Sequence, residues 1–484
     1  MSATPHLPSA RLGRKHYQSD THTPVLSACD GALLAYQDWA TAEQIDAAVA
    51  AARTAAPAWR ATAPTQRAAW LRAIAQQVRG EHAVLIALQM RVNGKPRLEA
   101  ELDLDDVVAC LIYYAGLCES GEAFATEAVT LPRADLRGQK RWEAVGVAAL
   151  VVPWNFPMVT TAWKLAPALA AGCTVVLKPS ELTAPAEHAL LDLIERVGLP
   201  DGVVNLVGGG AAVGGALVAH PGVDKVSFTG STAVGRQVMR AAAEHFKRLT
   251  LELGGKSALI VREDADLAQA VELALAGAFT NAGQMCSATS RILVHQHRYA
   301  ELVTALSAAI GALQAGPPEA EGCALGPLIS AAQRERVQAL VKRGRAAGAT
   351  RLASGRVHNA ADAAGCFMAP ELYTLTDSDN PLWQEEIFGP VACVQACASD
   401  GDLIAAANAT PYGLVATVLT RDATAAAHFE RELRAGLVWV NTPQLIFPQV
   451  CWGGLGASGI GRELGLEGLR AYQELRHAVF EGPA

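Results

Sequence analysis

Hydrophobic positions recur along this chain with two different periods. Up to about residue 122 they follow helical spacing and predict amphipathic helices over Thr41–Arg60, Thr65–Arg91 and Arg97–Glu122. Beyond residue 145, short buried runs alternate with helical segments. The runs that we expect to be strands are Val145–Val152, Cys173–Leu177, Val203–Val207, Lys225–Thr229 and Arg248–Leu251. Short apolar strands that alternate with helices predict a doubly wound, mainly parallel α/β sheet.

Two further segments complete the predicted architecture. A second alternating α/β segment follows Cys286 and runs to about Val440, which indicates a second α/β domain. Thr126–Trp142 breaks the helical pattern and predicts an extended arm of the kind that pairs with another subunit's sheet edge. Ala471–Phe480 is expected to form one last strand.

Composition narrows the class of protein. A chain of 484 residues with 51% hydrophobic and 18% charged residues is a globular protein of two or three domains. The net charge of -7 provides no basic field for nucleic acid, and no run of 18 apolar residues predicts a membrane span. The ten cysteines are irregularly spaced without a CxxC pair, and the N-terminus lacks a secretory signal, so we expect free thiols and a cytoplasmic protein. No metal-ligand spacing is visible, and no catalytic metal is expected.

The stretch from Leu251 to Ala288 holds the strongest candidate chemistry. Glu252 ends a strand, and Cys286 lies in a loop with Gly283 and Gln284. The intervening segment, 266–281, predicts a buried helix that brings the two ends together. A loop cysteine is a candidate nucleophile, although a buried free thiol is the commoner fate of a single cysteine.

Three loops follow predicted strands at the edge where parallel sheets bind ligands. They are Pro153-Trp154-Asn155-Phe156-Pro157, Lys178-Pro179-Ser180-Glu181 and Phe228-Thr229-Gly230-Ser231-Thr232. The last is a Gly-rich turn into a helix, where backbone N–H groups favour phosphate. A single turn of this kind is also often only a tight turn.

Taken together with Glu252-Leu253-Gly254-Gly255-Lys256, Gly283-Gln284-Met285-Cys286 and Glu386-Ile387-Phe388-Gly389-Pro390, these loops resemble the motifs of the aldehyde dehydrogenase superfamily, in the same order and over nearly the whole chain. The resemblance implies an α/β fold of two doubly wound domains with a small β arm, assembled as a homodimer or homotetramer. The implied parts are an NAD-binding domain (1–125 and 143–254), a catalytic domain (255–450) and an oligomerisation arm (126–142 and 470–484).

The resemblance also implies a mechanism. Cys286 attacks the aldehyde carbonyl, Asn155 and the Cys286 backbone N–H stabilise the oxyanion, and Glu252 activates the water that cleaves the thioester. Because Glu252 is present, hydrolysis is favoured over transfer to coenzyme A. A non-catalytic relative is disfavoured, since all three residues are retained.

The cofactor implied is NAD, because a carboxylate at Glu181 accepts from ribose hydroxyls and repels the 2′-phosphate of NADP; NADP is the weaker alternative, and a helix-capping role for Glu181 stays open. The residues assigned to the cofactor are Val152, Trp154, Lys178, Ser180, Glu181, Gly209, Phe228, Gly230, Ser231, Glu386 and Phe388. Lys164 and Glu463 match positions of a proton relay, with a buried structural pair as the alternative.

The substrate assignment rests on similarity to the betaine-aldehyde and aminoaldehyde dehydrogenases. The residues that match this subgroup's tunnel are Asp103, Asp106, Phe156, Trp163, Ile446 and Trp452. Aromatic faces hold cations, and the two aspartates are expected to pair with an ammonium group. Thr280 replaces a frequent aromatic residue and Ile446 a small one, which favours a primary ω-aminoaldehyde over betaine aldehyde. An apolar tunnel for aromatic or aliphatic aldehydes is the alternative, with the aspartates serving only the helix dipole.

Overall fold

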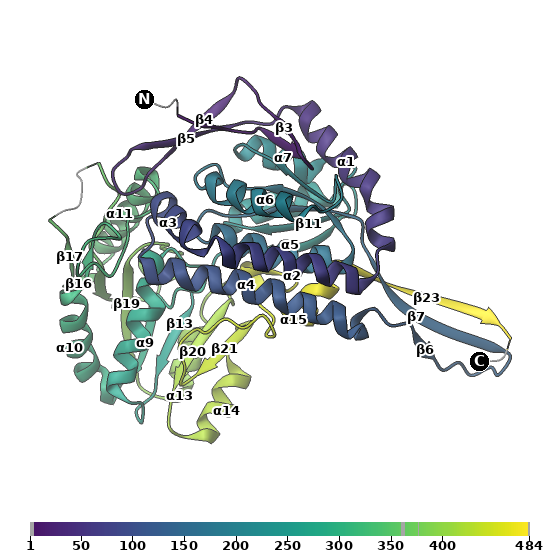
Figure 1. Ribbon diagram of the computed structural model, residues 1–484. Coiled ribbons are helices and arrows are strands. Elements are labelled where there is room, and N and C mark those ends of the chain that lie inside the picture. The colour runs from purple at the N-terminus through teal and green to yellow at the C-terminus, as the bar shows by residue number, and fades with distance from the viewer. Residues whose placement is uncertain (1–3, 360–363, 376, 483–484) are drawn as a thin grey trace.

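Two sheets with helices on their faces form the body of the molecule in the computed structural model (Figure 1). The structure describes residues 4–359, 364–375 and 377–482. The predicted domain and arm ranges also include residues 1–3, 360–363, 376 and 483–484, which lie outside the described residues.

The first sheet has eight strands in the order β22-β12-β11-β8-β9-β10-β2-β3. Its strands are β2 (Ala10–Leu12), β3 (Lys15–Tyr17), β8 (Val147–Val151), β9 (Thr174–Lys178), β10 (Val204–Val207), β11 (Lys225–Thr229), β12 (Arg248–Glu252) and β22 (Gly459–Ile460). The five strands from β12 to β10 are parallel, which confirms the five predicted strands and the doubly wound sheet. The short β22 comes from the far end of the chain and pairs Gly459 with Glu252.

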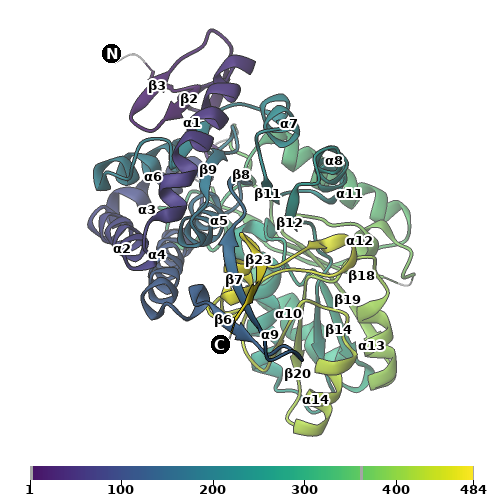
Figure 2. The same cartoon turned by 90° about the vertical axis from the view of Figure 1, so that its right-hand side faces the viewer.

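Helices α1 (Ala42–Ala61), α2 (Pro64–Gly80), α3 (His82–Asn93), α4 (Arg97–Ser120), α5 (Pro157–Ala171), α6 (Ala184–Val197), α7 (Ala211–Ala219) and α8 (Thr232–Ala243) cover this sheet. The prediction of one helix over Thr65–Arg91 was wrong, because the helix is interrupted at Glu81, between α2 and α3. Every residue of α5 is buried. Helix α5 packs on both β8 and α4, so it is enclosed on two sides (Figure 2).

The second sheet has its own hydrophobic core and seven strands in the order β16-β18-β19-β14-β13-β20-β21. Its strands are β13 (Ala258–Val261), β14 (Arg291–His295), β16 (Thr350–Ser354), β18 (Glu371–Thr374), β19 (Val391–Cys397), β20 (Val415–Leu419) and β21 (Leu437–Val440). The helices of this half are α9 (Leu267–Phe279), α10 (Gln296–Ala312), α11 (Ala331–Ala346), α12 (Pro381–Gln384), α13 (Asp400–Asn408) and α14 (Ala423–Glu432). The predicted second alternating α/β segment is therefore confirmed.

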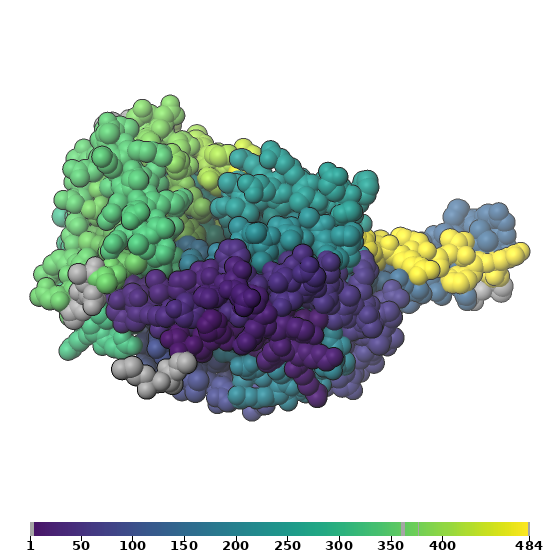
Figure 3. All heavy atoms as spheres, turned by 90° about the horizontal axis from the view of Figure 1, so that it is seen from above, coloured from purple at the N-terminus to yellow at the C-terminus, as the bar shows by residue number. Residues whose placement is uncertain are grey.

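A three-stranded sheet projects from the body as a narrow arm (Figure 3). It consists of β6 (Glu127–Val129), β7 (Leu136–Ala144) and β23 (Gln473–Glu481). The predicted extended arm and last strand thus pair with each other, in antiparallel register along nine residues of β7. The domain limits and the subunit assembly stay predictions.

The remaining elements are short. They are β1 (His6–Leu7), β4 (His22–Leu26) and β5 (Leu33–Asp38), which form a small sheet; β15 (Gln314–Ala315) and β17 (Arg356–Val357); helix α15 (Gly465–Arg470); and the 3-10 turns Glu122–Phe124, Thr280–Gly283 and Gly456–Ser458. Across the described residues, no helix is both long and apolar enough to cross a membrane.

Candidate active site

The loop that carries Cys286 begins with two residues in a left-handed conformation. Helix α9 ends at Phe279, and Asn281 and Ala282 then have φ values of 52° and 53°. Such backbone is unfavourable for residues other than glycine and persists only where the surroundings impose it. The Glu99 carboxylate from α4 accepts a hydrogen bond from the Asn281 backbone N–H at 3.0 Å. Contacts with the first half of the molecule therefore hold the entrance to this loop.

The two ends of the stretch from Leu251 to Ala288 meet in space, as the sequence predicted. A Cβ atom at Gly255 would lie 2.3 Å from the carbonyl oxygen of Cys286, so the strand end and the cysteine loop are in direct contact. Asn155, in the loop after β8, donates its side-chain amide to the carbonyl of Gln284 at 3.0 Å. Cys286, Glu252 and Asn155 all line one cavity of about 400 Å³.

The environment of the thiol does not favour the thiolate. Burial raises the pKa of Cys286, and the nearby carboxylates of Glu252 and Glu386 raise it further. A cysteine with this environment reacts only when a base removes its proton or when a positive charge enters the site. The thiol is therefore the resting form in the protein alone.

Glu252 is buried at the end of β12 beside a second carboxylate. Burial raises the pKa of Glu252 well above its ordinary value, and Glu463 raises it further. Glu463 is itself paired with the buried Lys164, whose amino group also donates to Thr229 at 2.7 Å. Ser227 donates to the same Glu463 carboxylate at 3.0 Å. The predicted relay pair thus lies within electrostatic reach of Glu252.

A second pocket of about 220 Å³ joins the first at Cys286 and Asn155. Trp154, Gly230, Ser231, Glu386 and Phe388 line it, as predicted for cofactor residues. Gly230 is required here, because a Cβ atom would lie 2.6 Å from the ring of Phe228, another predicted residue. The rings of Trp154 and Phe388 meet edge to face at 5.3 Å. The Glu386 carboxylate accepts from the Gly255 backbone N–H at 2.9 Å.

Beyond this pocket, Lys178 and Glu181 form an ion pair of 3.3 Å at the end of β9. A Cβ atom at Gly210 would lie 3.7 Å from the Glu181 carboxylate, and Gly209 has a φ of 135° that favours glycine. These residues shape an open edge of the first sheet.

Val152 and Ser180 form hydrogen bonds with the nearby backbone. The Val152 N–H donates to the Lys178 carbonyl, and the Ser180 hydroxyl accepts from the Leu182 N–H. The side chain of Ser231 caps α8 by accepting from Val234. Of the predicted cofactor residues, these three therefore support local structure in the present arrangement.

The larger cavity contains the predicted substrate residues. Asp106 accepts a hydrogen bond from the indole N–H of Trp163 at 3.1 Å, and burial raises the pKa of Asp106 to about 7. Trp163 packs against Trp452 with ring centroids 5.5 Å apart. Ile446 and Phe156 also line the cavity.

Asp103 differs from the expectation that it pairs with a substrate ammonium. Its carboxylate accepts from the fully buried Lys95 at 2.6 Å, so its charge is already compensated. The same Lys95 ammonium lies 3.6 Å from the centroid of the Phe156 ring. The Lys95 ammonium thus already contacts both Asp103 and Phe156. Asp106 is therefore the carboxylate better placed to bind the ammonium group of a substrate.

Sequence reasoning missed several residues at both sites. The cavity is also lined by Glu99, Leu102, Asp105, Met285, Ser287, Gln444 and Leu445. Asp105 was visible as part of the acidic run but was not assigned. The backbone of Glu386 to Phe388 is held by Arg336 and Gln333 of α11, which donate to its carbonyl groups. No local motif identifies these two, because their contacts join segments about fifty residues apart.

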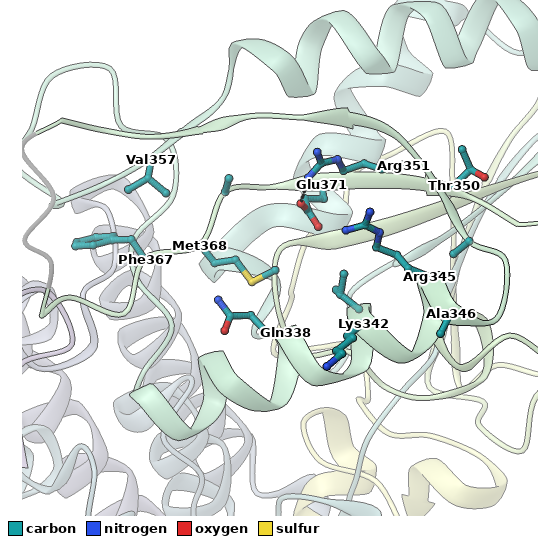
Figure 4. A pocket seen from close by; sticks show the side chains of 13 residues that line it. Gln338, Lys342, Arg345, Ala346, Thr350, Arg351, Val357, Phe367, Met368 and Glu371 are labelled. Atoms are coloured by element: carbon teal, nitrogen blue, oxygen red, sulfur yellow. Dashed lines mark hydrogen bonds and ion pairs between the residues drawn. The ribbon is translucent and has the colours of Figure 1, made fainter.

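A third hollow, of about 1010 Å³, lies between α11, the edge strand β16 and its neighbour β18 (Figure 4). Arg351 and Glu371 form an ion pair of 2.8 Å within it, and Lys342 and Arg345 add positive charge. None of the predicted catalytic residues lines this hollow.

Comparison with known proteins identifies the family. The model of the aldehyde dehydrogenase family matches residues 16–478, so the chain belongs to the aldehyde dehydrogenase family. It is 41% identical to the chloroplastic betaine aldehyde dehydrogenase of Beta vulgaris, over 91% of this chain and 89% of that protein. It is 42% identical to the peroxisomal aminoaldehyde dehydrogenase 2 of Pisum sativum, over 91% of this chain and 88% of that one.

The fold agrees. The crystal structure of a betaine aldehyde dehydrogenase from Staphylococcus aureus in complex with NAD+ superimposes with a TM-score of 0.95 at 33% identity, covering 98% of this chain and 95% of that chain. The predicted superfamily and fold class are confirmed.

Proposed function

We propose that this enzyme oxidises an ω-aminoaldehyde to the corresponding amino acid with NAD as the hydride acceptor. The observation that carries the proposal is the shape and lining of the 400 Å³ cavity. It extends from Cys286 and Asn155 to a carboxylate, Asp106, that is hydrogen-bonded to one tryptophan of a pair. An aldehyde at the thiol thus places a chain-terminal ammonium near a negative charge and aromatic faces.

The chemistry begins when the Cys286 thiol gives its proton to solvent, and the sulfur adds to the aldehyde carbon. The oxyanion that forms accepts hydrogen bonds from the Asn155 amide and the Cys286 backbone N–H, each worth about 3 kcal/mol of barrier. Loss of hydride from the carbon leaves a thioester on Cys286. Glu252 then takes a proton from water, whose oxygen attacks the thioester carbon and releases the carboxylate product and the Cys286 thiol, which takes the second proton of the water.

Glu252 must lose this proton before it can act as a base in the next catalytic cycle. Glu463 lies beside Glu252 and is bonded to Lys164 and Ser227, so the proton passes most directly into this buried group. We therefore assign Lys164 and Glu463 as the relay. The alternative, a purely structural ion pair, predicts no change in the pH profile of the deacylation step when the pair is replaced by apolar residues.

The pocket at Cys286 fits a nicotinamide cofactor. Glycine at position 230 leaves room over the Phe228 ring, and Glu386 and Phe388 line the wall next to the thiol. Lys178 and Glu181 would hold the adenosine ribose, where the carboxylate selects NAD over NADP. When bound, NAD accepts the hydride released from the substrate carbon.

The relatives' names support the substrate class, since they are betaine aldehyde and aminoaldehyde dehydrogenases. Ile446 lines the cavity, and its branched side chain, where the subgroup has a small residue, favours a primary ammonium over a trimethylammonium group. A generic apolar tunnel for neutral aldehydes is the second candidate, favoured by the internal pairing of Asp103 with Lys95.

The deciding measurement is kcat/KM for NAD reduction with 4-aminobutanal and with butanal on the same preparation. We expect a preference of at least tenfold for the amine, which corresponds to about 1.4 kcal/mol of transition-state binding. In Asp106→Asn this preference should fall, whereas Asp192→Asn on the far surface should leave it unchanged. Equal values in the unmodified enzyme, or a preference for butanal, would contradict the aminoaldehyde assignment.

Assembly and location extend this proposal. The exposed edges of the β6-β7-β23 arm support a homodimer or homotetramer formed through it. The cytoplasm is the proposed location; the plant relatives are named as chloroplastic and peroxisomal proteins.

A further inference from the structure

The small N-terminal sheet brings together two histidines and an aspartate that are far apart in the sequence. In this sheet His6 of β1 is opposite Tyr36 of β5, and His22 of β4 is opposite Asp38 of β5. Directly opposed residues share a face of a sheet, and so do residues two apart on one strand. All four side chains therefore lie on the same face.

The geometry of this face is that of a small coordination site. One ligand atom each from His6, His22 and Asp38 lies within 4.8 Å of the other two. His6 Nδ1 already contacts a carboxylate oxygen of Asp38 at 2.8 Å. Asp38 is 1% exposed, whereas both imidazoles are exposed at the surface. The buried Asp38 carboxylate can supply negative charge to a bound ion, and the two exposed imidazoles leave one side of that ion open to solvent.

The rings are also positioned in advance. The ring of Tyr36 stacks on His6 at 4.9 Å and meets His22 edge to face at 4.8 Å, while the two imidazoles are 5.0 Å apart. The second oxygen of Asp38 accepts from the Ser19 backbone N–H at 3.4 Å, which orients the carboxylate. Packing and hydrogen bonds of this kind fix ligand rotamers before a metal arrives.

We propose that His6, His22 and Asp38 bind a divalent transition-metal ion of the Zn²⁺ class, with solvent as the fourth ligand. Two imidazoles and one carboxylate are the donors that such ions prefer, and three protein ligands leave one position for water. The site lies in the small sheet of β1, β4 and β5 near the N-terminus (Figure 1), and none of its three residues lines either pocket at Cys286. The bound ion cross-links β1 and β4 to β5.

This cross-link stabilises the part of the first sheet that carries the loop after β10. Asp38 precedes Trp39, whose ring packs against Gly209 and Gly210 in the loop after β10. The Ala40 backbone N–H donates to Gly208 at 2.8 Å. A metal held by Asp38 therefore stiffens the strand that supports this loop.

A second cluster, Glu263, His295 and His297, provides a matched control. In that cluster His295 Nδ1 already accepts from the His297 backbone N–H and caps α10, and the nearest carboxylate contacts are 3.5 and 3.9 Å. Metal binding there would break the cap, so we expect the N-terminal site to be the tighter one.

The test is calorimetric titration of Zn²⁺ into tag-free, metal-stripped protein that carries Cys286→Ser to remove the catalytic thiol. We expect one equivalent to bind, with the affinity reduced at least tenfold by His22→Ala and by Asp38→Asn and unchanged by His297→Ala. Zn²⁺ should also raise the Tm of the parent protein but not that of His22→Ala. His22 is exposed, so its replacement leaves the fold intact.

Loss of binding in His297→Ala with retention in His22→Ala would overturn the proposal and assign the metal to the second cluster. Binding that survives all three variants would assign the ion to the remaining thiols, and no saturable binding would reduce the N-terminal group to a hydrogen-bonded aromatic cluster.

Discussion

Gly255 is in contact with the backbone of Cys286: a Cβ atom at position 255 would lie 2.3 Å from the Cys286 carbonyl oxygen. This contact joins the end of the first sheet to the loop that carries the nucleophile. It fixes the distance between Glu252, three residues earlier and proposed as the general base, and the Cys286 sulfur that would carry the thioester.

Gly255→Ala is therefore expected to displace the cysteine loop, because backbone atoms cannot yield as a flexible side chain can. A shift of about 1 Å in a reacting group lowers kcat by roughly 10². Steady-state kinetics with the Tm of each variant separates this loss from unfolding. Gly311→Ala on α10, where nothing lies within 4 Å of the added atom, is the control and should retain activity. Full activity in Gly255→Ala would contradict the argument.

Glu252→Gln is expected to separate the two halves of the reaction. The amide cannot act as a base, so the thioester forms but is hydrolysed about 10² to 10⁴ times more slowly. Stopped-flow absorbance should then show a burst of one NADH per active site followed by a slow phase. Exposed Glu244→Gln should behave as the unmodified enzyme. A variant that loses the burst as well would show that Glu252 acts before hydride transfer.

The rate at which iodoacetamide modifies Cys286 should keep rising with pH beyond the pH at which an ordinary thiol is fully ionised. Burial and two carboxylates raise the pKa of this thiol. Glu252→Gln removes one of these charges and should shift the rate profile to lower pH. Glu263→Gln, on the surface near β14, should not shift it. The measurement is the rate of incorporation at Cys286 by peptide mass spectrometry, and a fast-reacting thiol at pH 7 in the protein alone would contradict the raised pKa.

The ionised Asp106 carboxylate should lower the free energy of unfolding at alkaline pH relative to acidic pH. Its folded-state pKa of about 7 lies above the ordinary carboxyl value of 3.8, so the folded protein binds the proton more tightly than the unfolded chain. This stabilisation is fully present below the ordinary value and is lost as pH rises toward about 7. Asp106→Asn keeps an acceptor for Trp163 without the charge.

We therefore expect Asp106→Asn to be more stable than the unmodified enzyme at pH 8, by about 1 kcal/mol or more, and equal to it near pH 4. Urea unfolding at the two pH values measures the difference. Asp105→Asn, on the exposed side of α4, should change neither value. An equal effect at both pH values would show that packing, and not charge, decides the outcome.

Much of the fold follows from local pattern. The five parallel strands of the eight-stranded first sheet were predicted from short apolar runs, since strands buried on both faces contain little else. The break between α2 and α3 was missed, because Gly80 and Glu81 interrupt an apolar pattern that continues on both sides. Asp103 was assigned to the substrate from its resemblance to the subgroup's tunnel residues. Its ion pair with Lys95 was missed, because Lys95 lies in the preceding loop and carries no signal of a buried ion pair.

The sequence by itself determined the family and the loops at the strand ends, and it singled out Cys286, Glu252 and Asn155 as the candidate catalytic residues, because these depend on residue types in a fixed local order. Only the tertiary structure decided which charges are compensated and which residues from distant segments meet. Lys164 and Glu463 are 299 residues apart, and His6 and Asp38 lie on separate strands. Pairings of this kind depend on strand register and on burial, which act between segments and leave no periodic trace in either one.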